Sequence, residues 1–235
     1  MVLDFVSGRT ENYELCLNLV GRVIKRGFKC VGRDLLAVLD EADALSKAIL
    51  AHFPTVKIQR CWVHKERNLH AYLSRKDHRE CSGLIDRIRK AQGEDDGKAG
   101  YAELEEFLGK RNQGALQSLR EGGDELLTFH RLNVPATLNQ TFLSTNIIEN
   151  VMLNYRRHTD RVTKWDAKTD QVDRWTSSAL LLAEEGFRRI RNYRDLPELI
   201  RVRRGSSARS WLRSGLAAAR RSCCAGDGLH CGAHL

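Results

Sequence analysis

Two acidic residues far apart in the sequence stand where a carboxylate can hold a divalent cation. Asp40 ends the short apolar run LLAVLD, whose length and composition predict a buried strand. Glu149 lies in STNIIEN, which predicts the first turn of a helix. Ligands in open α/β sheets gather at the carboxyl ends of strands. The two carboxylates are therefore candidate ligands of one divalent cation.

Each of these acids also has a purely structural interpretation. Asp is a favoured N-cap, so Asp40 could simply begin the helix that follows at Glu41. Asn146 and Glu149 have the spacing of a loosened capping box, in which the glutamate serves only its own helix end. Spacing alone leaves both interpretations open.

A Cys-x-x-His pair, Cys61 and His64, forms half of a zinc site by its spacing. A structural zinc needs four ligands, usually in two pairs. The nearby His70, His78 and Cys81 make no standard second pair, so zinc is disfavoured. The preferred interpretation is that Cys61 and His64 pack and hydrogen-bond locally. The seven cysteines follow no regular framework, which indicates reduced thiols.

Cations gather in two stretches that suit a phosphate backbone. Predicted DNA contacts follow the Cys-x-x-His pair and occupy the segment NYRRHTDRVTKW at 154–165; they are Lys65, Arg67, Arg156, Arg157, Arg161 and Lys164. The alternative is an ordinary solvated face. Trp165 and Trp175 are expected in the core rather than stacked on bases.

The elements that must position these residues are predicted to alternate between strands and helices at first and to be helical thereafter. Apolar runs predict strands at 1–6, 35–40 and 56–63, separated by amphipathic helices at about 11–28 and 41–53. From about 64 to 130 only helical patterns appear. Further helices are predicted from about 145 and over about 171–193. This order indicates an α/β layered sheet followed by a long helical segment.

The composition fits a DNA-binding protein that does not span a membrane. The chain is 42% hydrophobic and 29% charged, and no apolar run approaches the ~18 residues of a membrane span. With no signal peptide recognisable at the start, we expect a cytoplasmic location. The net charge of +9 favours polyanionic partners. Residues 201–235 carry seven Arg and one Asp, which together contribute +6 of this charge. The stretch 205–235 is expected to be a disordered basic tail.

The order of these motifs resembles the bacterial Mutator-type insertion-sequence transposases, which are DDE enzymes. The motifs are a strand ending in Asp40, then F-P-x(4)-Q-R-C-x-x-H-K-x-x-N-L from Phe53 to Leu69, then T-N-x-I-E from Thr145 to Glu149, over about residues 1–200. The resemblance implies a ribonuclease-H-like mixed sheet interrupted by an all-helical insertion. It divides the chain into 1–63, the first part of the catalytic core; 64–140, the insertion; 141–204, the C-terminal helices of the core; and 205–235, the tail.

The resemblance also implies roles for individual residues. Asp40 matches the family's second catalytic Asp and Glu149 its catalytic Glu, while Cys61, His64 and Asn146 belong to its signatures. The implied cofactor is Mg²⁺ or Mn²⁺, and the implied chemistry is DNA cleavage and strand transfer by two metal ions. The implied partners are transposon ends and target DNA, with a homo-oligomer for the full-length protein in the bacterial nucleoid.

Three departures from the family pattern qualify this expectation. The family's first Asp lies on a strand upstream of MVLDFVSG, and Asp4 falls after that position, so we expect an N-terminally truncated chain with an incomplete sheet and site. We likewise expect the family's N-terminal DNA-end-binding region to be absent from this chain. Glu41 stands where the family usually has glycine. The alternatives are an inactive remnant that only binds DNA or interferes with full-length transposase, and a zinc-stabilised module built on Cys61 and His64.

Overall fold

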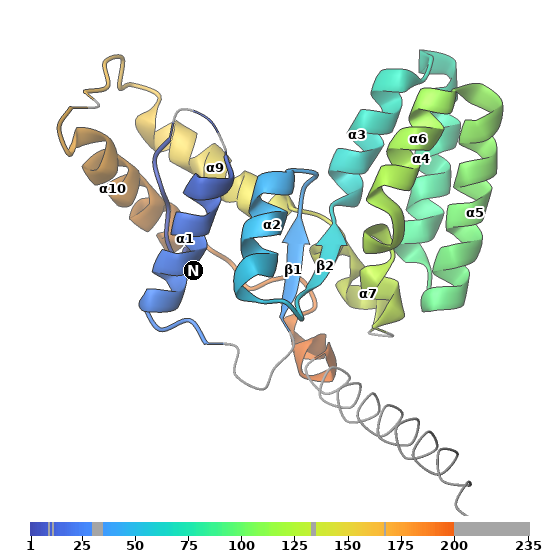
Figure 1. The fold of residues 1–235 in the computed structure, drawn as a ribbon, viewed down its shortest axis with the longest axis horizontal. Coiled ribbons are helices and arrows are strands. Elements are labelled where there is room, and N and C mark those ends of the chain that lie inside the picture. The colour runs from blue at the N-terminus through green and yellow to red at the C-terminus, as the bar shows by residue number, and fades with distance from the viewer. Residues whose placement is uncertain (9, 11, 30–34, 133–134, 167, 200–235) are drawn as a thin grey trace, which may run out of the picture.

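A computed structural model describes residues 1–8, 10, 12–29, 35–132, 135–166 and 168–199 of the chain (Figure 1). The predicted tail at 205–235 lies outside these residues. The elements in chain order are α1 (Tyr13–Lys25), β1 (Leu36–Leu39), α2 (Asp43–His52), β2 (Lys57–Arg60), α3 (Trp62–Tyr72), α4 (Arg75–Lys90), α5 (Glu94–Arg111), α6 (Gln113–Gly122), η1 (Gly123–Leu126), α7 (Thr128–Arg131), η2 (Ala136–Leu138), α8 (Asn139–Phe142), α9 (Asn146–Thr159), α10 (Gln171–Glu185) and η3 (Tyr193–Asp195).

The sheet of the described residues consists of two parallel strands joined through a helix. Leu36 lies opposite Lys57 and Leu39 opposite Arg60, and α2 makes the crossover between the strands. Leu45, Ile49 and Phe53 of this connection pack on a small core formed by Leu39, Val56 and Ile58. Parallel strands end at the same edge of a sheet, so the residues after β1 and after β2 emerge side by side.

Helix α1 covers α2 on the side away from the bundle (Figure 1). Asn12 caps it by accepting a hydrogen bond from the backbone N–H of Leu15 at 2.9 Å. Its buried residues, Cys16 and Val20, meet Ala48 of α2. Asp4, in the segment before α1, accepts two hydrogen bonds from the guanidinium of Arg22, at 2.9 and 3.0 Å. Asp4 is thus a structural acid.

Helices α3 to α8 form a bundle beside β2 that contains the largest core of the described residues (Figure 1). Its fully buried side chains include Trp62, Leu69, Ile85, Leu104 and Leu119. This helical stretch begins at Trp62, slightly before the predicted start of the insertion at 64. Helix α9 then leads back past the sheet and packs against α10.

Several predictions of secondary structure and burial are wrong. Residues 1–6 are not a strand, because no strand of the described chain lies beside them to complete backbone pairing. The second strand ends at Arg60 instead of residue 63, and α10 ends at Glu185 rather than near 193. Trp165 and Trp175 are 41% and 45% exposed and do not lie in the core.

The fold is α/β in the sense of a small parallel sheet with helices, and most of the described residues are helical. A mixed sheet of the ribonuclease-H type is not formed by the described residues, which contribute two parallel strands only. The division into a core and an insertion therefore stays a prediction. None of the helices in the described ranges combines the length and the apolar character needed to cross a bilayer.

Candidate active site

The carboxyl end of β2 is joined to the start of α9 by backbone hydrogen bonds. The N–H of Cys61 donates to the carbonyl of Leu39 at 2.7 Å and continues the sheet by one residue. The N–H of Trp62, at the first position of α3, donates to the carbonyl of Leu143 at 2.9 Å. Because Leu143 lies just before α9, this bond fixes the start of α9 at the edge where the two strands end.

Thr145 links the Cys-x-x-His pair to the catalytic glutamate candidate. Its N–H lies 3.3 Å from Cys61 Sγ, and its hydroxyl lies 3.2 Å from His64 Nδ1 and 3.3 Å from Glu149 Oε1. The hydroxyl also lies 3.4 Å from Cys61 Sγ. A hydroxyl has one proton, so it donates to one of these groups at a time. Thr145 is buried, which shields these hydrogen bonds from water.

His64 makes a second contact with the same carboxylate. Its Nε2 lies 3.3 Å from Glu149 Oε1, while its Nδ1 faces Thr145. One imidazole therefore bridges the end of β2 and the first turn of α9. This is the local hydrogen bonding that the sequence left as the alternative to zinc binding. Glu149 is 40% exposed at its side chain, so it is oriented by these neighbours and still open to solvent.

Asp40 lies directly after β1 and is half-buried. Its Oδ1 accepts a hydrogen bond from the N–H of Ala42 at 3.1 Å, which closes the turn that leads into α2. Its backbone carbonyl accepts from Nη1 of Arg60 at 2.8 Å. The N-cap position of α2 is Ala42 rather than Asp40, so the simple N-cap interpretation is not met. Asp40 nevertheless uses one carboxylate oxygen for local structure.

Asp40 and Glu149 belong to the same edge of the sheet, but the contacts described here do not join the two carboxylates directly. Within the described ranges, no group of three or more His, Cys, Asp or Glu side chains has the arrangement of a metal site. The carboxylate oxygens suit Mg²⁺ in chemical type. Glu41 also lies at this edge, but both of its oxygens contact protein groups. The ligands are therefore too few, because two acids of the described residues remain for a metal.

Asn146 is the first residue of α9 and is exposed. The position before it, Thr145, is the N-cap residue, and it makes no side-chain hydrogen bond to the backbone of the helix. The capping box between Asn146 and Glu149, one of the two interpretations that the sequence left open, is therefore not formed. The side chain of Glu149 turns instead to Thr145 and His64.

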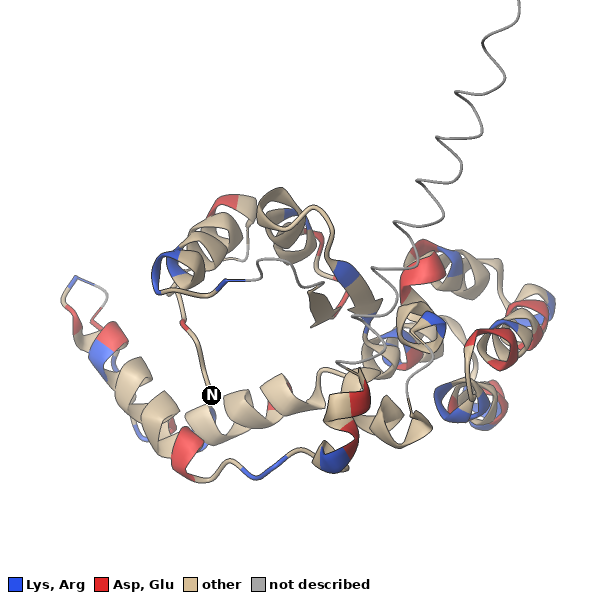
Figure 2. Cartoon of the chain, turned by 90° about the horizontal axis from the view of Figure 1, so that it is seen from below, with Lys and Arg blue, Asp and Glu red and all other residues tan. Residues whose placement is uncertain are grey.

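The predicted DNA contacts fall into an exposed group and one buried exception. The exposed cations are Arg67, Arg156, Arg157, Arg161 and Lys164. Lys65 is 1% exposed at its side chain, and its ammonium pairs with the carboxylate of Glu41. In this arrangement the ammonium of Lys65 is not accessible to a phosphate, so the structure does not favour Lys65 as a DNA contact. Over the helical bundle, acids and bases alternate (Figure 2).

The thiol and imidazole with perturbed pKa values lie in the bundle rather than at the sheet edge. Burial, with a smaller effect of Glu66, raises the pKa of Cys81 to about 12. Burial also lowers the pKa of His130, against the opposing effect of a hydrogen bond to the carbonyl of Ile88. Both groups are therefore neutral at pH 7 and belong to the core.

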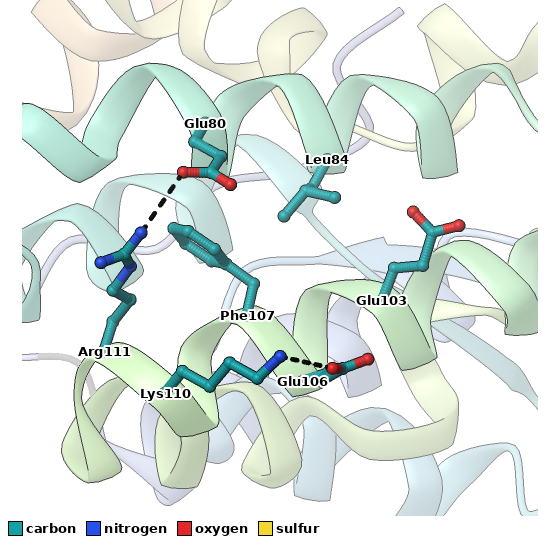
Figure 3. A pocket seen from close by; sticks show the side chains of 7 residues that line it. All are labelled: Glu80, Leu84, Glu103, Glu106, Phe107, Lys110 and Arg111. Carbon is teal, nitrogen blue, oxygen red and sulfur yellow. Dashed lines mark hydrogen bonds and ion pairs between the residues drawn. The ribbon is translucent and has the colours of Figure 1, made fainter.

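A shallow pocket of about 470 Å³ lies between α4 and α5 (Figure 3). Its apolar floor is formed by Leu84 and Phe107. Four of the charged side chains around it form two pairs: Arg111 lies 3.7 Å from Glu80, and Lys110 2.5 Å from Glu106. The fifth, Glu103, pairs with Arg87 outside the lining. With these charges neutralised locally, we assign the pocket no part in the site.

Thr145 is the member of the site that the sequence interpretation missed. The T-N-x-I-E motif contains it, but its sequence signal is weaker than that of Asn146 and Glu149, since amides and carboxylates are the usual caps and ligands. The signal that could have identified it is its position directly before a helix, where threonine is a favoured residue. Its partners Cys61 and His64 lie more than 80 residues earlier, so spacing could not reveal them.

Curated relatives of this chain are transposases of insertion sequences. It is 30% identical over 163 residues to the transposase for insertion sequence element IS6120 of Mycolicibacterium smegmatis, covering 69% of this chain and 49% of the relative. It is 28% identical over 153 residues to the ISRM3 transposase of Rhizobium meliloti (strain 1021), covering 63% and 36%. It is 26% identical over 163 residues to the IS905 transposase of Lactococcus lactis subsp. lactis (strain IL1403), covering 68% and 39%.

The chain thus spans about half or less of the length of these relatives. The model of the family "Transposase, Mutator family" matches residues 1–173. This match includes both acids, the Cys-x-x-His pair and Thr145, and it stops near the beginning of α10, short of the predicted limit at about 200. By this match and by its relatives, the chain belongs to the Mutator family of transposases.

Proposed function

We propose that this chain forms part of the DDE catalytic core of a transposase, in which Asp40 and Glu149 supply two of the carboxylates that hold divalent metal. The supporting observation is the Thr145 network, which ties Glu149 to the edge of the sheet where Asp40 emerges. A catalytic constellation must be held by neighbours that fix its side chains. Thr145 and His64 have this relation to Glu149.

The roles of the chain's own residues follow from these contacts. Asp40 is held by the N–H of Ala42 through one oxygen, which leaves the other available as a ligand. Glu149 is oriented through Oε1 by His64 and Thr145, and solvent reaches its carboxylate. Magnesium or manganese, when bound, would activate a water or a 3′-hydroxyl and stabilise the leaving oxygen. Zinc is not part of the proposal, since Cys61 and His64 serve the Thr145 network.

The number of acids favours weak metal binding and little strand transfer by this chain. Three carboxylates hold two divalent ions in the chemistry that the family resemblance implies. At this edge Asp40 and Glu149 remain for a metal, because the third described acid, Glu41, pairs with a buried lysine. DNA binding without efficient cleavage is therefore the second candidate function. The exposed cations of α9 and the segment after it support this candidate.

Metal binding tests the first proposal. Mn²⁺ titration calorimetry is performed on the parent chain, on Asp40→Asn and on Glu149→Gln, with Asp160→Asn as the control because Asp160 is an exposed acid at the end of α9. We expect binding by the parent chain and by the control, and loss of binding in each of the two site variants. Binding that survives either site substitution would contradict a shared site.

DNA binding tests the second candidate. The parent chain, Arg156→Gln/Arg161→Gln and the control Lys76→Gln, an exposed cation of α4, are compared on a duplex at several salt concentrations. If each arginine contacts a phosphate, the double variant lowers the slope of log K against log salt by about 0.9 per lost contact. The control should leave the slope unchanged. Equal slopes for all three proteins would contradict the assigned surface.

A further inference from the structure

Lys65 is a buried cation whose partners come from two separate segments, the turn after β1 and helix α6. Its Nζ pairs with Oε1 of Glu41, directly after Asp40, and donates to the carbonyl of Ser118 in α6 at 2.7 Å. The Ser118 hydroxyl lies 3.5 Å from the same nitrogen. The stem of Lys65 runs beside Gly122, where an added Cβ would lie 3.2 Å from Lys65 Cε. The ammonium is thus enclosed by α6 on one side and by Glu41 on the other.

Glu41 is held by two residues of the same face of α3. One carboxylate oxygen pairs with Lys65, and the other accepts a hydrogen bond from Nδ2 of Asn68. Residues three apart are neighbours on a helix, so the two partners form a fork around the carboxylate. Both oxygens of Glu41 are therefore occupied within the protein, which argues against Glu41 as an extra metal ligand.

A buried ammonium is stable only when it is paired and hydrogen-bonded. Burial of Lys65 therefore requires Glu41 to stay in place, and Glu41 shares a tight turn with Asp40, whose Oδ1 accepts from the N–H of Ala42. Arg60 adds a second tie by donating to the carbonyl of Asp40 and pairing with Glu125 of η1 at 2.6 Å. The turn that carries Asp40 is thus attached to the helical bundle on two sides.

We propose that Glu41 and Lys65 are positioning residues that couple the Asp40 turn to the helical bundle, so that packing of the bundle sets the orientation of the Asp40 carboxylate. This inference rests on the proposed role of Asp40 for its functional meaning. Its structural content is independent of metal: without the pair, the turn at 40–42 loosens while the bundle core keeps its order.

The test compares local amide exchange in matched variants. Glu41→Gln/Lys65→Met removes both charges at similar volume, which avoids leaving one charge buried alone. The control Glu94→Gln/Lys98→Met removes an exposed ion pair of α5. Exchange is followed by NMR at Ala42, whose N–H bonds to Asp40, and at Leu69 in the bundle core. We expect exchange at Ala42 to become at least tenfold faster in the first variant, with Leu69 and the control unchanged.

Other outcomes overturn the coupling. Unchanged exchange at Ala42 means that the pair does not hold the turn, and equal acceleration at Ala42 and Leu69 means that the pair acts only on global stability. Should the double variant not fold, Asn68→Ala removes one tie and keeps the ion pair. It should accelerate Ala42 selectively, by about threefold or more, and no selective change would overturn the proposal.

Mn²⁺ titration of the same proteins separates this inference from the proposed function. A parent chain that binds Mn²⁺ should lose at least fivefold in affinity in Glu41→Gln/Lys65→Met, and an unchanged affinity contradicts a positioning role toward metal. A parent chain that binds no Mn²⁺ contradicts the proposed metal site. In that case the exchange at Ala42 still decides whether the coupling exists.

Discussion

Gln59 of β2 joins the sheet to the bundle through a fully buried amide, and its replacement by leucine tests that connection. Its Nε2 donates to the carbonyls of Leu126 at 2.9 Å and Arg60 at 2.7 Å. Its Oε1 accepts from the N–H of Phe129 at 2.8 Å. This N–H lies in the first turn of α7, where a helix supplies no internal acceptor. Gln59 therefore satisfies an otherwise unpaired end of α7.

The expected cost of Gln59→Leu follows from these three bonds. The N–H of Phe129 loses its acceptor, and a buried unsatisfied donor costs about 1–3 kcal/mol. The carbonyl of Leu126 keeps a second donor, Nε1 of Trp62 at 3.0 Å, so its loss is smaller. Added apolar burial by leucine offsets part of the cost. The free energy of unfolding should fall by about 1–3 kcal/mol.

Urea unfolding followed by circular dichroism at 222 nm measures this change. The matched control is Gln117→Leu, an exposed glutamine of α6, which should stay within about 0.5 kcal/mol of the parent chain. A Gln59→Leu chain that also stays within about 0.5 kcal/mol would refute the reasoning. It would mean that the buried amide contributes no net stability and that α7 finds another acceptor.

Three further predictions concern ionisable groups. Burial lowers the pKa of His130 in the folded chain, so the unfolded chain binds a proton at this residue more readily. The free energy of unfolding should therefore fall as the pH drops below about 6.5, the ordinary pKa of histidine. The free energy of unfolding should fall less between pH 7.5 and pH 5.5 in His130→Gln than in the parent chain. An identical fall in the two proteins would show that His130 is not the source of the pH dependence. Because burial raises the pKa of Cys81 to about 12, its thiol should resist DTNB at pH 8 until urea is added, and native labelling at Cys81, mapped by mass spectrometry, would contradict this. Asp4→Asn weakens the pairing with Arg22 and should cost about 1 kcal/mol, since that arginine is partly exposed and screened by solvent; no change in the urea midpoint would show that the pair contributes nothing.

Local sequence patterns predicted the helices and strands that form because of the apolar pattern of their own residues. Alternation of apolar runs and amphipathic helices predicted β1, α2 and β2, because a parallel pair with a helical crossover needs only those short patterns. The long helical stretch after Cys61 followed from its period in the same way. The order of the motifs around Asp40, Cys61 and Glu149 was sufficient to identify the family, and the match of the family model over residues 1–173 confirms it.

The tertiary structure determines which polar and aromatic side chains are buried and which are exposed. Lys65 has the charge expected of a DNA contact, yet it is buried. Its ammonium can be buried because the carbonyl of Ser118, 53 residues later, accepts a hydrogen bond from it. Trp165 and Trp175 were predicted to be core residues, yet they are 41% and 45% exposed. Whether a side chain is buried depends on which segments pack against it, and the spacing of residues in the sequence does not predict those segments.

The sequence by itself therefore determined the family, the strand–helix–strand unit and the two acids that the proposal uses. Only the tertiary structure revealed Thr145 as the link between Cys61, His64 and Glu149, and Glu41 as the partner of Lys65. The reason is physical. Backbone periodicity and turn chemistry act over a few residues, whereas a hydrogen-bond network is set by which distant segments the packing of cores brings together.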